Sequence, residues 1–104
     1  MKQGYNQNQS IIEYIQDFSQ DQNTEDVLNK HHDRKLTEEE TSIGLLIFED
    51  IHQTCKEDTT TIEEKIENLR QKSVRYLSEE YDPEQLYFIL SPNLYDFLIT
   101  LWEL

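Results

Sequence analysis

The chain of 104 residues has few of the residue types on which several classes of protein depend. Cys55 is its only cysteine, so no disulfide forms within the chain, which excludes a disulfide-stapled secreted domain. Two glycines, Gly4 and Gly44, are too few for a glycine-rich phosphate-binding loop. The most apolar stretch, residues 86–104, is interrupted by polar and acidic residues, so we expect no bilayer span.

Targeting signals are also missing from the N-terminal residues. The first ten residues hold one lysine and no apolar segment, which does not fit a secretory signal peptide. A lone cysteine favours a reducing compartment. We therefore expect a cytoplasmic protein.

Positive charge is scarce, because 22 Asp and Glu residues face 9 Lys and Arg, for a net charge of −13 at pH 7. Such a chain repels phosphate backbones and anionic lipid headgroups, so we expect it to bind neither nucleic acid nor a membrane directly. No lysine or arginine follows Arg75, whereas residues 76–104 hold six acids and most of the aromatic residues. Leu, Ile, Val and Phe supply 28 residues, enough for a modest core.

Three capping boxes of the form Ser/Thr-x-x-Glu, at Ser10, Thr37 and Thr61, predict helix starts. Apolar residues recur at spacings of three and four after each box, as in amphipathic helices. A shorter piece with Val27 and Leu28 follows Thr24. The predicted apolar stripes are Ile11, Ile12, Ile15 and Phe18; Ile43, Leu46, Ile47, Ile51 and Cys55; and Ile62, Ile66, Leu69, Ser73, Val74, Tyr76 and Leu77.

These signals predict an all-α fold, a small helical bundle built on a central antiparallel helix hairpin at about 37–57 and 61–79. An N-terminal helix precedes the hairpin. Two short C-terminal helices follow it, because Asp82-Pro83 and Ser91-Pro92 each place a capping side chain before a proline. The alternative is an α+β fold with a short strand at 86–90, since five consecutive apolar residues fit either structure.

The predicted domain division places a flexible polar lead at 1–9 and a single acidic helical domain at 10–104. Gly44 lies inside a predicted helix, where glycine costs about 1 kcal/mol relative to alanine. Its presence there indicates a close helix crossing.

Potential metal ligands are too few for a recognisable site. Glu49, His52 and Cys55 are three residues apart, and two histidines and an aspartate occupy 31–33. Structural zinc needs four ligands in pairs, and a di-iron bundle needs two Glu-x-x-His motifs where this chain has one. We expect Cys55 in the core, His52 partly exposed beside it, and no metal or other cofactor.

Catalytic constellations are equally sparse. His52 and Cys55 are neighbours on a helix, but no loop is present that could build an oxyanion site around them. In a chain with 22 acids, a pair of carboxylates is more simply a solvated face than a tuned acid and base. We therefore expect that the protein is not an enzyme.

Carboxylates interleaved with aromatic residues predict a surface that binds a cationic protein, because charge steers association and aromatic rings supply rigid contact area. The candidate electrostatic contacts are Glu49, Asp50, Glu57, Asp58, Glu63, Glu64, Glu79, Glu80, Asp82 and Glu84. The candidate aromatic anchors are Tyr81, Tyr95, Phe97 and Trp102.

The leading hypothesis is an acidic protein-binding inhibitor that neutralises a basic, nucleic-acid-acting protein, such as a toxin nuclease, by occluding its cationic cleft. In size, charge and helical character the chain is similar to immunity proteins of colicin and contact-dependent-inhibition systems, and to phage-encoded DNA mimics. That similarity lies in overall features and assigns no site residue. The alternative is a small structural or adaptor subunit bound through its apolar C-terminal segment, for which a second copy of the chain is another candidate partner.

Overall fold

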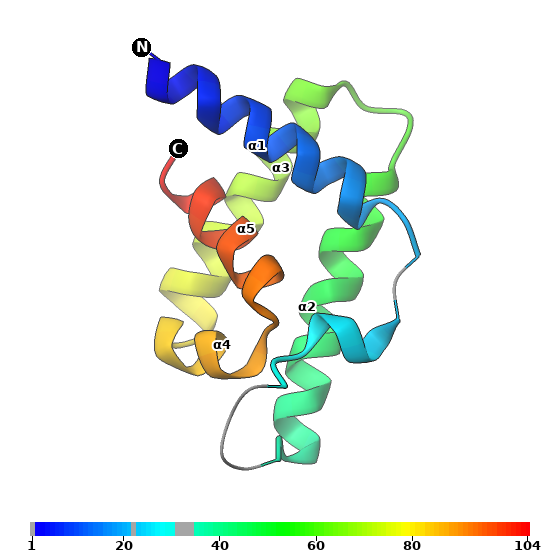
Figure 1. Ribbon diagram of the computed structural model, residues 1–104, viewed down its shortest axis with the longest axis vertical. Helices are drawn as coiled ribbons and strands as arrows, with labels where there is room; N and C mark the ends of the chain where they lie inside the picture. The colour runs from blue at the N-terminus through cyan, green and yellow to red at the C-terminus, as the bar shows by residue number, and fades with distance from the viewer. Residues whose placement is uncertain (1, 22, 31–34) are drawn as a thin grey trace.

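The fold is an all-α bundle, as predicted (Figure 1). The computed structural model describes residues 2–21, 23–30 and 35–104, and no strand occurs within these ranges. The elements in chain order are α1 (Lys2–Phe18), the 3₁₀ turn η1 (Thr24–Val27), α2 (Glu38–Lys56), α3 (Ile62–Val74), the π-helical segment η2 (Arg75–Glu80), α4 (Pro83–Ile89) and α5 (Pro92–Trp102).

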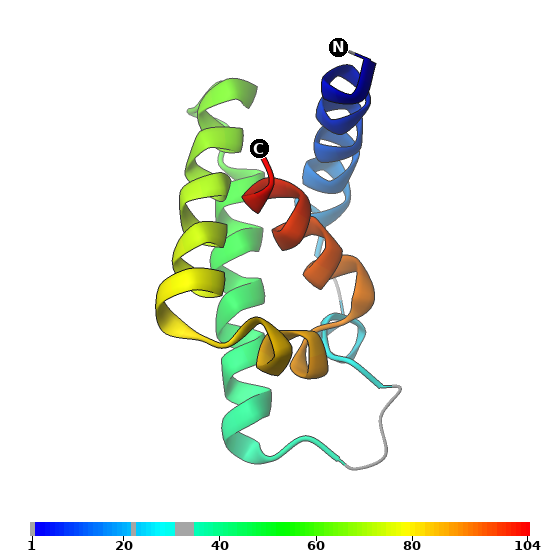
Figure 2. The same ribbon diagram turned by 90° about the vertical axis from the view of Figure 1, so that its left-hand side faces the viewer.

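Helices α2 and α3 form the predicted central antiparallel hairpin (Figure 2). The Thr37 hydroxyl accepts from the Glu40 amide at 3.1 Å, and the Glu40 carboxylate accepts from the Thr37 amide at 2.9 Å. Thr61 and Glu64 make the same reciprocal pair at the start of α3, at 3.1 and 3.0 Å. Both helix starts were predictable because a capping box satisfies two backbone amides locally, whatever the rest of the fold does.

Helix α1 begins earlier than its sequence signal indicates. The prediction of a helix start at Ser10 is wrong, because the helix runs without a break from Lys2 to Phe18. The polar residues that precede Ser10 include good helix formers such as lysine and glutamine, which continue the helix in the N-terminal direction. Ile11, Ile15 and Phe18 are buried as expected. The division of the chain at residue 9 stays a prediction.

Helix α5 lies between α1 and α3 and closes the core (Figure 2). Phe97 of α5 stacks on Phe18 of α1, with ring centroids 5.4 Å apart and planes 3° from parallel. Tyr14 also stacks on Phe97 at 5.0 Å, and Phe48 of α2 meets Phe18 edge-on at 6.4 Å. Aromatic contacts therefore join the first and last helices to the hairpin.

The buried face of α2 is rotated from the predicted stripe. Leu46 was assigned to that stripe, but 58% of its surface is exposed. Phe48 and His52 are buried in its place, because α1 packs against that side of the helix and brings Phe18 onto it. The buried residues of α2 are Gly44, Ile47, Phe48, Ile51, His52 and Cys55.

On α3 the predicted stripe is confirmed in its C-terminal half, where Leu69 and Ser73 are buried, and it continues into η2. The Ser73 hydroxyl donates to the Leu98 carbonyl of α5 across this contact. Ile62, at the start of the stripe, is 43% exposed, because it lies at the end of the hairpin beyond the core.

The two predicted C-terminal helices are confirmed as α4 and α5, and the alternative of a strand at 86–90 is wrong, because α4 covers residues 86–89. Pro83 starts this helix at its first position, and the helical period then turns Leu86 and Ile89 inward and Tyr87 outward. Leu90 alone pairs in a β manner, in an isolated antiparallel bridge with Leu28.

The bridge between residues 28 and 90 passes over Gly44 of α2. A Cβ atom added at Gly44 would overlap Leu28 Cδ2 and lie 3.1 Å from Ile89 Cγ2. Its φ angle is not positive, so the requirement is for space rather than for an unusual backbone conformation. The predicted close approach at Gly44 is therefore present, but only part of it is a helix crossing: Ile89 belongs to α4, whereas Leu28, the nearest neighbour, belongs to the non-helical segment after η1.

We expect Gly44→Ala to lower the free energy of unfolding by about 1 kcal/mol, because overpacking of about 1–3 kcal/mol outweighs the gain of about 1 kcal/mol in helix propensity. Urea unfolding followed by circular dichroism measures the change. Ser42→Ala, at an exposed position of the same helix, is the control and should not destabilise the protein. A Gly44→Ala protein more stable than the parent would contradict the expected destabilisation, because the gain in helix propensity would then exceed the cost of overpacking.

Candidate functional site

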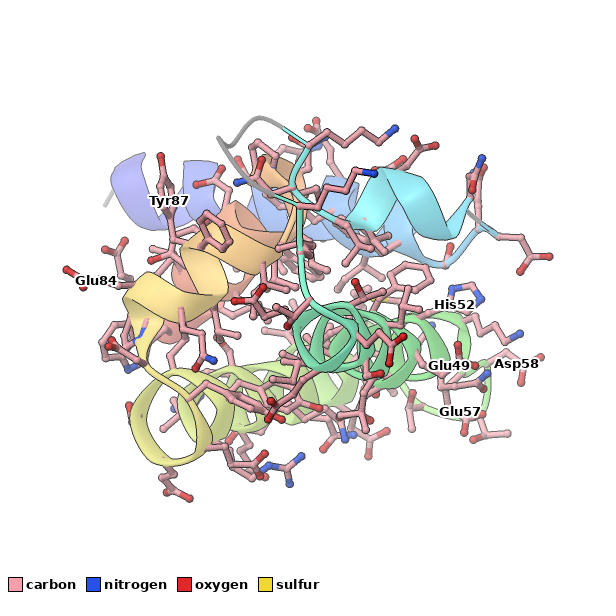
Figure 3. All side chains as sticks on the ribbon, turned by 90° about the horizontal axis from the view of Figure 1, so that it is seen from below. Glu49, His52, Glu57, Asp58, Glu84 and Tyr87 are labelled. Atoms are coloured by element: carbon pink, nitrogen blue, oxygen red, sulfur yellow. The ribbon has the colours of Figure 1, made fainter. Side chains whose placement is uncertain are left out.

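The candidate carboxylates form two separate surfaces at opposite ends of the hairpin. Figure 3 shows Glu57 and Asp58 on one side of the molecule and Glu84 on the other. Residues 64 and 79 are fifteen positions apart along α3 and η2, which corresponds to about 22 Å. The loop-end surface consists of Glu57, Asp58, Glu63 and Glu64, and the α4 surface consists of Glu79, Asp82, Glu84 and Tyr87.

Glu49 belongs to neither surface, because it is exposed on α2 about two turns before the helix ends at Lys56. Leu46, one turn before it, is exposed on the same helix. The outer face of α2 is thus acidic with one apolar side chain, and it offers no aromatic anchor.

The carboxylate of Asp50 is already paired with other side chains of the fold. Its carboxylate accepts a hydrogen bond from the Tyr76 hydroxyl at 2.5 Å, and it forms ion pairs with Lys72 at 3.1 Å and Arg75 at 3.7 Å. Burial, followed by the hydrogen bond to this carboxylate, raises the pKa of Tyr76. Asp50 therefore joins α2 to α3 and η2, and its charge is compensated before any partner arrives.

Two lysines partly compensate the negative charge of the loop-end surface. Lys56 lies in the last turn of α2, and Lys65 lies in the first turns of α3. Glu64 is engaged in the capping box, and Glu57 accepts from the Thr59 amide at 3.4 Å. This surface is acidic, but its charges are mixed and partly used by local structure.

A hollow of about 400 Å³ lies between α2 and α3 near the loop end. Its two cationic side chains, Lys72 and Arg75, both pair with Asp50, and its lining contains no His, Cys or Ser. The lining residues are Gln53, Thr54, Glu57, Thr60, Asn68, Gln71, Lys72 and Arg75.

The α4 surface has the least compensated carboxylates. Glu79 and Glu84 are exposed, and neither forms an ion pair within the described ranges. Asp82 caps α4 by accepting from the Glu84 amide at 3.2 Å, yet its side chain remains at the surface. Glu80 is the exception, because it pairs with Arg75 at 3.2 Å. Three unpaired acids therefore lie close together along the chain.

The predicted aromatic anchors differ in their access to solvent. Phe97 is fully buried, so it serves the core and is withdrawn from the set of surface anchors. Tyr81 is half-buried and packs on Tyr76 at 6.2 Å. Tyr95 is half-buried, and Trp102 is 42% exposed at the end of α5.

Tyr87 was missed by sequence reasoning, although it is 65% exposed. It lies within the apolar run at 86–90, where five neighbouring apolar residues hide the helical period. The signal that could have found it is Pro83, because counting helical turns from a proline at the first position places residue 87 away from the core.

His52 is buried rather than partly exposed, with 6% of its surface accessible. Its Nδ1 lies 2.8 Å from the Phe18 carbonyl oxygen. A carbonyl only accepts, so Nδ1 carries the proton and donates. Nε2 lies 3.3 Å from the carboxylate of Asp21, and the ring stacks on Phe48. His52 therefore links α2 to the end of α1.

Cys55 is a core residue, as expected, with 1% of its surface exposed. Burial raises the pKa of its thiol to about 12, which keeps it protonated and unreactive at neutral pH. No group of three metal-ligating side chains occurs among residues 2–21, 23–30 and 35–104. His31, His32 and Asp33, which the sequence offers as further potential ligands, lie outside the described residues.

No family model, curated protein or solved structure matches the chain. Function is therefore inferred from the residues and their geometry alone. In the part of the chain that the structure describes, no helix is both long enough and apolar enough to cross a bilayer.

We expect His52→Leu to lower the free energy of unfolding by about 1–3 kcal/mol, because it leaves the Phe18 carbonyl without its donor. Thermal unfolding with and without added zinc measures the change. Zinc should leave the melting temperature of the parent protein unchanged. Zinc stabilisation of the parent that disappears in His52→Leu would instead make His52 a metal ligand.

We expect stability to fall between about pH 9 and pH 12. The pKa of Cys55 is raised from 9.0 to about 12 by burial, and that of Tyr14 from 10.0 to about 12 by burial and the 2.6 Å hydrogen bond to Asp96. A pKa raised by folding means that the protonated group stabilises the fold, so its contribution is complete below the unfolded value and disappears as pH rises through the folded one.

Urea unfolding at a series of alkaline pH values measures this loss. Tyr14→Phe keeps the ring but removes the titrating hydroxyl, so its stability should depend less steeply on pH above 10 than that of the parent. Identical slopes for the two proteins would show that Tyr14 ionises equally in the folded and unfolded states.

Proposed function

We propose that the protein binds and neutralises a basic, nucleic-acid-acting protein, and that the α4 surface occupies the cationic cleft of that partner. The binding is non-enzymatic: carboxylates take the positions that phosphates would fill, and exposed aromatic rings provide the desolvated centre of the contact. This is the mode of action of an immunity protein, antitoxin or DNA mimic.

The observation that carries the proposal is the distribution of compensated and uncompensated charge. Lys72 and Arg75, the last two cations of the chain, both point to Asp50 of the hairpin. Glu79, Asp82 and Glu84 follow them and form no ion pair with any described residue. Like charges held together raise the free energy of the compact state, and a cationic partner relieves that repulsion.

The aromatic residues support the same surface. Tyr81 precedes the cap of α4, and Tyr87 projects from the helix on the same side as Glu84 (Figure 3). The loop-end surface has no comparable ring, and its lysines would repel a basic partner. Of the two acidic surfaces, the α4 surface therefore fits a cationic protein better.

The alternative, an adaptor subunit bound through the C-terminal segment, has less surface available than the sequence indicates. Leu94, Phe97, Leu98 and Leu101 are all buried within the chain itself. Trp102 and Leu104 are the large hydrophobic residues of this segment that stay exposed, at 42% and 44%. Two side chains at a helix end make a small contact compared with a standard interface of about 800 Å² per partner.

The proposal is tested by capturing partners from a host-cell lysate at low salt with the parent protein and with a triple variant, Glu79→Gln, Asp82→Asn and Glu84→Gln. Asparagine retains the N-cap at position 82. A captured basic protein should be released by salt, should lose its bound DNA or RNA to this chain in a competition assay, and should associate about ten-fold more slowly with the triple variant.

The matched control carries the same change in net charge at exposed carboxylates elsewhere, Glu13→Gln, Glu39→Gln and Glu103→Gln. It should retain the parent association rate within about two-fold. If both variants slow association equally, the effect is one of net charge and the α4 surface is not the binding site. A captured partner that resists salt and ignores nucleic acid would contradict the proposed function.

A further inference from the structure

Tyr87 and Tyr95 form an aromatic corner on the surface of the molecule. Their ring centroids are 5.2 Å apart and their planes meet at 77°. Tyr87 is 65% exposed, so it presents ring surface to solvent, whereas Tyr95 is half-buried and forms the inner wall. Burial raises the pKa of Tyr95, which keeps its hydroxyl neutral.

A carboxylate lies on the same side of this corner. Glu84 precedes Tyr87 by three residues on α4, a spacing that brings Cβ atoms within about 5–6 Å of each other on a helix. Both side chains extend outward from α4 (Figure 3). Glu84 is exposed and forms no ion pair within the described ranges, so its charge is available to a ligand.

The backbone beneath the corner is held in place. The Tyr87 carbonyl accepts from the Asn29 side chain at 3.3 Å. The backbone amide of Asn29 donates to the Ile89 carbonyl at 2.8 Å, and the backbone amide of Ser91 donates to the Val27 carbonyl at 2.9 Å. These bonds tie the end of α4 to the segment after η1, so the corner is formed before any ligand binds.

We propose that this corner is the recognition site for an arginine side chain of the partner, whose guanidinium stacks on Tyr87 and pairs with Glu84. The inference rests on the proposed function and specifies which partner residue occupies the centre of the contact. A guanidinium suits the corner better than an ammonium because it is planar, weakly hydrated, and able to stack on a ring while donating to a carboxylate.

The site is open to solvent, so we expect its affinity for a single arginine to be low. The contact would contribute mainly to the specificity of partner binding. A cation over an exposed tyrosine ring strengthens binding about two- to five-fold. Arginine and tyrosine are enriched among the residues that dominate protein interfaces, which fits a contact at the centre of a larger surface.

The test uses two short peptides, acetyl-Gly-Arg-Gly-amide and its counterpart with citrulline, a neutral side chain of the same shape. NMR of protein with ¹³C-labelled tyrosine rings follows the titration at low salt. The arginine peptide should shift the Tyr87 and Tyr95 signals, with the citrulline peptide binding more weakly by about two- to five-fold. Equal binding of the two peptides would overturn the proposal.

Point variants distinguish the contribution of the Tyr87 ring from that of the Glu84 charge and from general effects on the fold. Tyr87→Leu keeps the apolar area but removes the aromatic ring, so it should weaken binding of the arginine peptide about two- to five-fold. Glu84→Gln should weaken this binding by a similar factor. Tyr87→Phe keeps the ring and should bind the peptide like the parent. Glu103→Gln, at the end of α5, is the matched control for the loss of one exposed carboxylate and should leave binding unchanged. Unchanged binding in Tyr87→Leu overturns the assignment.

The corner and the proposed function fail in different ways. If Tyr87→Leu alters neither peptide binding nor partner association, while the triple acidic variant still loses the partner, the corner is rejected and the function stands. If arginine peptides bind the corner but no captured basic protein competes with nucleic acid, the corner stands and the function is rejected.

Discussion

The packing of α5 between α1 and α3 is the contact on which the rest of the molecule depends. Phe97 stacks on Phe18, and Ser73 donates to the Leu98 carbonyl, so the middle of α5 contacts both the first and the third helix. Burying one apolar side chain of this size contributes about 1.5–3 kcal/mol, and α5 buries four. Against a net stability of about 5–15 kcal/mol for a domain, this contact is indispensable. It also withdraws most of the apolar C-terminal segment from any external partner.

The same arrangement explains where the charge excess is found. Asp50 faces α3 and η2 on a partly buried surface, and it draws Lys72, Arg75 and the Tyr76 hydroxyl toward it. A partly buried carboxylate has a strong need for such partners, because desolvation without compensation is costly. Lys72 is therefore used inside the hairpin and Arg75 is shared between Asp50 and Glu80, whereas Glu79, Asp82 and Glu84 form no ion pair among the described residues and are left to solvent or to a cationic protein.

Much of the fold was predictable because its signals are local. Thr37 and Thr61 satisfy neighbouring amides, and Pro83 and Pro92 have a backbone angle suited to the first position of a helix, so each acts without tertiary contacts. The candidate site was less predictable. Tyr87 projects outward only because Leu86 and Ile89 are drawn inward, and Phe97 is buried only because Phe18 covers it.

The amino-acid sequence alone determined the helical class, the central hairpin, the net charge and the absence of cations beyond Arg75, because propensity, capping and composition are properties of short segments. Tertiary structure alone decided which side chains reach solvent. Leu46, His52, Tyr87 and Phe97 each occupy a side of a helix that its sequence pattern leaves ambiguous, and the neighbouring helix chooses between burial and exposure. The physical reason is that the apolar area of a small domain is buried through contacts between segments distant in the chain, which no local pattern records.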